Sequence, residues 1–208
     1  MARIFIGLCL HYLLLATSTF VIVQSQKPQI PAELQRLYNT DLETWVAPKE
    51  FLKDFPYYLS GFDEEDHPIW VLEFGRWDIR TTVERGPKSQ AKFDKYVDQA
   101  VMIIYNSSIP DDGINPVIGI VDFEGYNLRQ LSSAKTLEYI IQKLRLILIA
   151  LTNLQSAYFI NVNFFAEKIL NLVRPVLGKE FAKPSMAVSK NIYVYQIPPE
   201  NLGLFAVR

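Results

Sequence analysis

Residues 116–125 read PVIGIVDFEG, and this stretch decides the fold class of the chain. Pro116 precedes the run 117–123, whose only charged residue is Asp122, and Gly125 follows shortly after it. An apolar run of this length, bounded by a proline and a glycine, is typical of a strand that is buried on both faces of a parallel sheet. We therefore predict a buried central strand over residues 117–123.

Helical and strand-like patterns alternate on both sides of this run. We expect strands at 69–74, 156–162 and 185–188, and helices at 32–46, 91–105, 132–151 and 164–173. Ser132 or Ser133 is the natural N-cap of the long third helix, and Pro175 is expected to end the fourth. Residues 51–59 indicate a short helix or turn, and residues 76–90 a polar loop. The alternation predicts an α/β fold with right-handed crossovers.

The composition excludes several classes of protein. The chain has 208 residues, of which 50% are hydrophobic and 13% aromatic, so it is too apolar to be disordered. Its formal net charge is -1, which argues against a nucleic-acid binder that works through a basic field. The counts of one Cys and two His exclude most thiol, disulfide and zinc chemistry.

The first 25 residues are predicted to be a secretory signal peptide. A short basic start is followed by residues 4–23, which carry no charge, and cleavage is expected near Ser25. A membrane anchor through residues 4–23 and an incorrectly assigned start are the alternatives. Cleavage would place the protein outside the cell or in the ER lumen and would leave His67 as the only histidine. In that compartment Asn106 lies in the sequon Asn106-Ser107-Ser108 and is a candidate for N-glycosylation.

No catalytic or cofactor pattern is found. Neither of the glycine-rich phosphate-binding motifs nor a G-x-S-x-G elbow occurs, and one histidine cannot anchor a zinc site. His67 and the acidic run 63–66 are interpreted as a solvated turn, and Glu73 as a paired or edge carboxylate with a site contact as the alternative. We therefore expect no enzyme activity, no cofactor and no metal.

The apolar content of the fourth helix goes beyond what one buried face needs. Residues 164–177 read FFAEKILNLVRPVL, so apolar side chains occupy most sides of the helix. Such a helix is either fully covered by core, or packs one face on the core and another on an apolar ligand cavity or a membrane surface.

Five segments in order resemble the CRAL-TRIO lipid-binding domain, the family of phosphatidylinositol, tocopherol and retinaldehyde carriers. They lie in family order between about residues 55 and 202 and read DEEDHPIWVLEFGRWD (63–78), VDFEG (121–125), YFIN (158–161), LVRPVL (172–177) and IPPENL (197–202). The resemblance implies an αβα sandwich with a mostly parallel sheet, which forms the floor of an apolar lipid pocket under a mobile helical lid.

The alternation of side chains along the strands then assigns residues to the implied pocket. The predicted lipid-binding residues are Trp70, Leu72, Phe74, Val117, Gly119, Val121, Ala157 and Phe159 from the sheet, and Phe165, Ile169 and Val173 from the lid. Asp122 would face away.

Departures from the family pattern narrow the chemical class of the expected ligand. Thr152 stands where inositol-lipid binders have Glu, and Val117 and Gly119 stand where choline-lipid binders have hydroxyl groups. Lys183 is the remaining candidate for a headgroup contact. We therefore expect a small neutral hydrophobe, such as a sterol, tocopherol, carotenoid or retinoid. Asn163 replaces a family proline, and the segment after Leu202 departs from the family ending, which predicts a truncated or rearranged C-terminus.

The predicted organisation is a signal peptide (1–25), a linker with a short N-terminal helix (26–50) and a lipid-binding domain (51–208). The predicted function is non-catalytic binding and transfer of a small hydrophobic lipid, with transient membrane contact and without nucleic-acid or metal partners. The alternative is a module with a degenerate pocket that contacts a membrane or a protein.

Overall fold

The computed structural model describes residues 29–110, 113–177, 186–189 and 192–196. Six strands form one sheet in the order β1-β2-β3-β4-β6-β5. Their bounds are β1 (Tyr57–Phe62), β2 (Pro68–Leu72), β3 (Val117–Asp122), β4 (Leu154–Ile160), β5 (Met186–Ser189) and β6 (Ile192–Gln196). Strands β2, β3 and β4 are parallel neighbours, whereas β1 and β6 each run antiparallel to the strand beside them. The expected α/β fold is confirmed, and its parallel pairing is confined to the three central strands.

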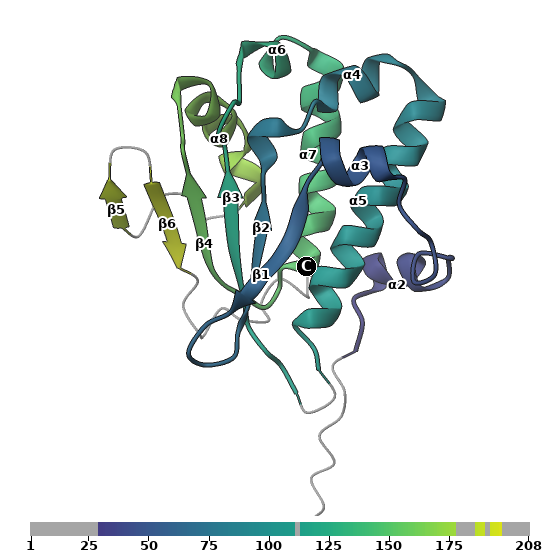
Figure 1. Ribbon diagram of the computed structural model, residues 1–208, viewed down its shortest axis with the longest axis vertical. Coiled ribbons are helices and arrows are strands. Elements are labelled where there is room, and N and C mark those ends of the chain that lie inside the picture. The colour runs from purple at the N-terminus through teal and green to yellow at the C-terminus, as the bar shows by residue number, and fades with distance from the viewer. Residues whose placement is uncertain (1–28, 111–112, 178–185, 190–191, 197–208) are drawn as a thin grey trace, which may run out of the picture.

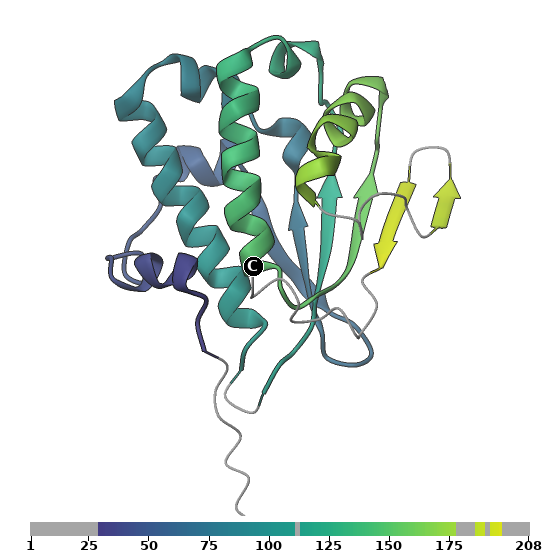
Figure 2. The same ribbon diagram turned by 180° about the vertical axis from the view of Figure 1, so that it is seen from behind.

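The longer helices lie together on one face of the sheet. Figure 1 shows the sheet in front of α5, α7 and α8, and Figure 2 shows these helices in front of the sheet. The helical elements are α2 (Ala32–Tyr38), α3 (Lys49–Asp54), the 3-10 turn η1 (Phe74–Arg76), α4 (Ile79–Glu84), α5 (Pro87–Ser107), α6 (Leu128–Leu131), α7 (Ala134–Ala150) and α8 (Phe164–Leu177). Within the described ranges, no helix has both the length and the hydropathy that crossing a membrane requires.

Local sequence signals explain where several helices begin. The Ser133 hydroxyl accepts a hydrogen bond from the backbone N–H of Thr136, so this serine is the N-cap of α7, as predicted. Helix α5 begins at Pro87, which tolerates the first helical position because its missing N–H would be unpaired there anyway. Gly86 precedes it with φ of 95°, a conformation that favours glycine.

The buried side chains form two clusters. One joins α2, α3, α4, α5 and α7, and its centre includes the fully buried rings of Phe93 and Tyr96. The other lies between the sheet and α8 and includes Trp70, Phe159 and Ile169. The second cluster adjoins the cavity described below.

Three local predictions were wrong. The short helix or turn expected at 51–59 is present as α3 in its first half, but its second half was wrong, because residues 57–59 belong to the edge strand β1, which pairs with β2. The loop expected at 76–90 contains α4, because Asp78 caps the helix and Ile79, Thr82 and Val83 bury one face of it. The helix expected at 32–46 ends at Tyr38.

Two element ends also differ from the prediction. Helix α8 continues through Pro175 to Leu177, so the end predicted at this proline was wrong. The strand expected at 69–74 ends at Leu72, so Glu73 and Phe74 lie beyond it. The predicted signal segment, the candidate headgroup residue Lys183 and the segment after Leu202 lie outside the described residues.

Candidate functional site

An apolar cavity of about 190 Å³ lies between the central strands and helices α5, α7 and α8. Its wall consists of apolar atoms. The sheet and the turn after β2 contribute residues that share one face, namely Trp70, Leu72, Phe74, Val117, Gly119, Val121, Leu154, Ala157 and Phe159. Helix α8 contributes Ile169, Leu170 and Val173. The cavity thus has the apolar lining that binding of a hydrocarbon requires.

The strand register explains why the sheet side of the cavity is continuous. Trp70 on β2 is level with Gly119 on β3, which is level with Ala157 on β4. Two residues further on, Leu72, Val121 and Phe159 form a second row. Because side chains alternate between the two faces of a strand, both rows point to the same side.

Ten of the eleven predicted site residues line this cavity. Phe165 does not; its half-buried side chain packs against the cluster between the sheet and α8. Phe74 lines the cavity from η1 and not from a strand. That these residues bind lipid stays a prediction, since no ligand is present.

Sequence reasoning missed the opposite wall. Helices α5 and α7 contribute Phe93, Val97, Ile104, Tyr139, Ile140, Lys143, Leu144, Ile147 and Leu148, and the segments around them add Trp77, Ile79, Phe123 and Leu151. The apolar spacing of α7 was visible in the sequence. The sequence does not show which face of the sheet this helix covers, because that depends on how the crossover connection packs.

Lys143 is the charged residue of the lining, and its charge is neutralised away from the cavity. Its ammonium group lies 2.7 Å from an Asp94 carboxylate oxygen and 3.1 Å from one of Asp98. Asp94 also accepts a hydrogen bond of 2.8 Å from the Tyr139 hydroxyl. Burial, together with this hydrogen bond, raises the pKa of Tyr139 above its ordinary value. The hydrocarbon parts of Lys143 and Tyr139 therefore line the cavity. Their polar ends take part in a network of hydrogen bonds and ion pairs between α5 and α7.

Among the described residues, the three positions compared with headgroup-binding relatives, Val117, Gly119 and Thr152, offer no free polar group to the cavity. Val117 is almost fully buried, and Gly119 has no side chain. The Thr152 hydroxyl donates a hydrogen bond to the Ile149 carbonyl oxygen, and Thr152 does not line the cavity.

The predicted lid, α8, is fixed at its N-terminus by Asn163. The Asn163 side-chain oxygen accepts hydrogen bonds of 3.0 Å from the backbone N–H groups of Phe165 and Ala166. Its amide group donates a hydrogen bond of 2.8 Å to the Tyr126 carbonyl oxygen in the loop after β3. A side chain thus caps the helix and ties it to the adjacent loop, at the position where the family has a proline.

The outer face of α8 carries two exposed apolar side chains beside polar ones. The side chain of Phe164 is 63% exposed and that of Leu172 is 45% exposed. Lys168 lies between them on the same stripe, with its Nζ 5.0 Å from the centroid of the Phe164 ring. Phe164, Lys168 and Leu172 therefore form an exposed stripe of α8, with two apolar side chains and one cation, on the side away from the cavity.

The residues weighed for chemistry lie outside the cavity lining. His67 Nδ1 is 3.0 Å from an Asp63 carboxylate oxygen, so this turn histidine is paired and half-buried and not freely solvated. Glu73 forms an ion pair with Arg76. The described part of the chain contains no group of three or more His, Cys, Asp or Glu side chains that could hold a metal ion. Asn106 is exposed in the last turn of α5, and its side-chain oxygen accepts a hydrogen bond of 2.5 Å from the Tyr38 hydroxyl.

Comparison with known proteins identifies the family. The family model described as the CRAL/TRIO domain matches residues 52–203. A search of curated proteins finds no match. Proteins of this family are in general non-catalytic binders of hydrophobic molecules or lipids. The family match, together with an apolar cavity on the α/β sheet, shows that this chain belongs to the CRAL/TRIO domain family and is a lipid-binding protein.

Proposed function

We propose that this protein binds a small neutral hydrophobe in the cavity between the central strands and α8, and carries it between membranes without changing it chemically. The observation that carries the proposal is the apolar wall of the cavity, at which even Lys143 has its charge neutralised by Asp94 and Asp98. Burying a charged or strongly polar headgroup there would leave it without partners, which is costly. A sterol, tocopherol, carotenoid or retinoid carries at most a few polar atoms and avoids that cost.

The size of the cavity supports a lid mechanism. Ligand pockets usually measure about 300–1,000 Å³, whereas this cavity measures about 190 Å³. Cargo of the proposed class therefore needs extra space, and displacing α8 would supply it, because Ile169, Leu170 and Val173 close the cavity. We interpret the structure as the conformation in which α8 closes the cavity.

The exposed stripe of α8 is the proposed membrane contact. Phe164 and Leu172 can enter the headgroup region of a bilayer, while Lys168 stays near the lipid phosphates. Cargo would then leave the cavity on the side where the lid meets the membrane. Lid opening and membrane contact would in this way be coupled through one helix.

The proposed location is the secretory pathway or the extracellular space, with membrane anchorage through residues 4–23 as the alternative. The uncharged N-terminal segment and the exposed Asn106 side chain support it. Ser108, the third residue of the sequon, is fully buried, so a glycan would have to be attached before the end of α5 folds.

Native mass spectrometry with lipid extraction tests the proposal on the full chain secreted from eukaryotic cells. A stoichiometric neutral hydrophobe supports it and names the cargo class. A bound phospholipid would contradict the argument from Thr152, Val117 and Gly119. Digestion with an N-glycosidase, which lowers the mass only if Asn106 carries a glycan, tests the location in the same sample.

The small cavity volume also favours a second candidate function, an interaction module without cargo. In that case α8 would remain closed, and its exposed stripe would bind a membrane or a protein. A folded protein that is empty after purification, and still empty after incubation with sterol- and tocopherol-containing vesicles, would favour this candidate.

A further inference from the structure

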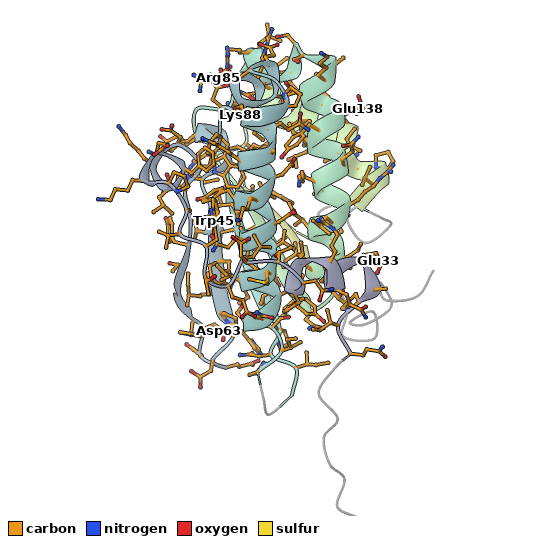
Figure 3. All side chains as sticks on the ribbon, turned by 90° about the vertical axis from the view of Figure 1, so that its right-hand side faces the viewer. Glu33, Trp45, Asp63, Arg85, Lys88 and Glu138 are labelled. Carbon is orange, nitrogen blue, oxygen red and sulfur yellow. The ribbon has the colours of Figure 1, made fainter. Side chains whose placement is uncertain are left out.

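A second, polar cleft of about 710 Å³ lies at the end of the molecule where α3, η1, α4 and the start of α5 meet. It shares no lining residue with the apolar cavity. Its lining comprises Glu50, Phe51, Lys53, Asp54, Phe55, Arg76, Asp78, Thr81, Thr82, Arg85, Lys88, Ser89 and Lys92. Figure 3 shows Arg85 and Lys88 near each other at this end of the molecule.

The charges of the cleft do not cancel. Arg76 pairs with Glu73, and Asp78 pairs with Arg129, so these two lining residues already have partners. Four exposed cations remain, namely Lys53, Arg85, Lys88 and Lys92, and none of them forms an ion pair with another described residue. They face two further carboxylates, Glu50 and Asp54. The cleft therefore holds an excess of positive charge that the described fold does not use.

One of these cations, Lys88, lies at the N-terminus of a helix, where a positive charge is unfavourable. Lys88 lies in the first turn of α5, which contains no acidic residue. The helix dipole makes that end of a 21-residue helix positive, so a carboxylate there would stabilise the fold and an ammonium group opposes it. Residues that violate a local rule of stability are often found at functional sites.

We propose that this cleft binds a phosphate-bearing anion. Cations from α3, α4 and α5 surround it, so a compact, multiply charged group would contact several of them at once, and Arg85 can donate two parallel hydrogen bonds to phosphate oxygens. The unpaired hydroxyl of Ser89 lies in the same lining. The net charge of -1 for the whole chain argues against an extended polyanion such as nucleic acid. A free phosphate and a lipid with a phosphate headgroup are the two sources of this chemistry.

The test compares three versions of the full chain. They are the wild type, the Lys88→Gln/Lys92→Gln variant, and a charge-matched control, Lys135→Gln/Arg145→Gln, whose exposed cations lie on α7 and do not line the cleft. Binding of inorganic phosphate is measured by titration calorimetry. Flotation is measured with phosphatidylcholine vesicles with and without phosphatidic acid. Circular dichroism checks that all three versions are folded.

We expect the cleft variant to bind about 25-fold more weakly, at roughly fivefold per cation, and the control variant to bind like the wild type. Loss of both phosphate and vesicle binding in the cleft variant would identify phosphate itself as the ligand. Loss of vesicle binding alone, with no free-phosphate binding by the wild type, would identify a lipid headgroup. Wild type that binds neither probe, or equal weakening in the two variants, would overturn the proposal. None of these results depends on whether the apolar cavity holds cargo, so this proposal and the proposed function can fail separately.

Discussion

The side-chain amide of Asn163 donates a hydrogen bond of 2.8 Å to the carbonyl oxygen of Tyr126, and this bond ties the N-terminus of α8 to the loop after β3. The same side chain caps the helix through Phe165 and Ala166. Asn163 therefore adds polar contacts to this end of the lid, beside the buried packing of Ala166 and Ile169. Movement of the lid is expected to be greatest at its other end, which follows Val173.

Replacing this anchor tests whether the lid controls cargo. Asn163→Ala removes the cap and the bond to Tyr126, so the free energy of unfolding should fall by about 1 kcal/mol and cargo should leave faster. Urea unfolding and the release rate of a fluorescent sterol measure the two effects. The control is Asn171→Ala on the exposed side of α8, which should change stability by less than about 0.5 kcal/mol. Unchanged release from Asn163→Ala would argue against α8 as the lid.

Filling the cavity from the sheet should block loading. Gly119 lies at its wall, and a Cβ atom there would meet its nearest neighbour, a Leu154 methyl group, at 3.6 Å. Gly119→Ala should therefore fold and load normally, whereas the indole of Gly119→Trp should occupy the cavity and prevent loading of cargo. Native mass spectrometry measures the bound fraction, and circular dichroism checks the fold. Normal loading of the Trp variant would show that the cargo lies elsewhere.

The exposed stripe of α8 should control transfer and not stability. Phe164→Ser/Leu172→Ser removes apolar side chains that the fold leaves largely exposed, so the unfolding free energy should change by less than about 1 kcal/mol. Because those side chains are proposed to enter the bilayer, transfer of a fluorescent sterol between vesicles should slow by about tenfold or more. Leu128→Ser is the matched control, since Leu128 is 57% exposed but lies on α6. Equal slowing by the control would contradict a specific role for α8.

Gly75 is expected to tolerate no side chain. A Cβ atom at this position would overlap the backbone carbonyl group of Glu124, where η1 approaches the loop after β3. Gly75→Ala should destabilise the fold by about 1–3 kcal/mol, because a backbone atom cannot move aside as the end of a side chain can. Urea unfolding compares the free energy of unfolding of Gly75→Ala with that of Gly119→Ala. Equal stability of the two variants would mean that η1 and this loop are not in close contact.

Asp78 should stabilise the fold in a pH-dependent manner. Burial raises the pKa of this carboxyl group, but the hydrogen bonds from Thr81, Gln130 and Arg129 outweigh burial and lower it to about 2. A lowered pKa in the folded state means that this stabilisation is complete above about pH 4 and is lost as the pH falls toward 2. Because the side chain is about half exposed, we expect only about 1 kcal/mol from it. The stability difference between wild type and Asp78→Asn, measured by urea unfolding, should be largest near neutral pH and shrink below pH 4; a constant difference would contradict this account.

Much of the sheet could be predicted from the sequence, and its edges could not. The central strands stood out because their apolar runs are bounded by proline or glycine, as around residues 117–123. Strand β1 was missed because Pro56 and Gly61 interrupt its pattern. Strand β6 was missed although its sequence, IYVYQ, has the β-branched and aromatic pattern of a strand. Helix α4 was missed although Asp78 gave a cap signal, because Gly86-Pro87 favoured a loop.

The order of residues along the central strands is enough to show which side chains lie on one face, and therefore that this face is apolar. The reason is that alternation along a strand is a local consequence of backbone geometry, as in Trp70 and Leu72 or in Gly119 and Val121. Three properties depend on how the domain packs: which helices cover that face, the neutralisation of Lys143 by Asp94 and Asp98 at the cavity wall, and the small volume of the cavity. These properties depend on contacts between residues about 45 or more positions apart in the chain, and such contacts form only when the whole domain packs.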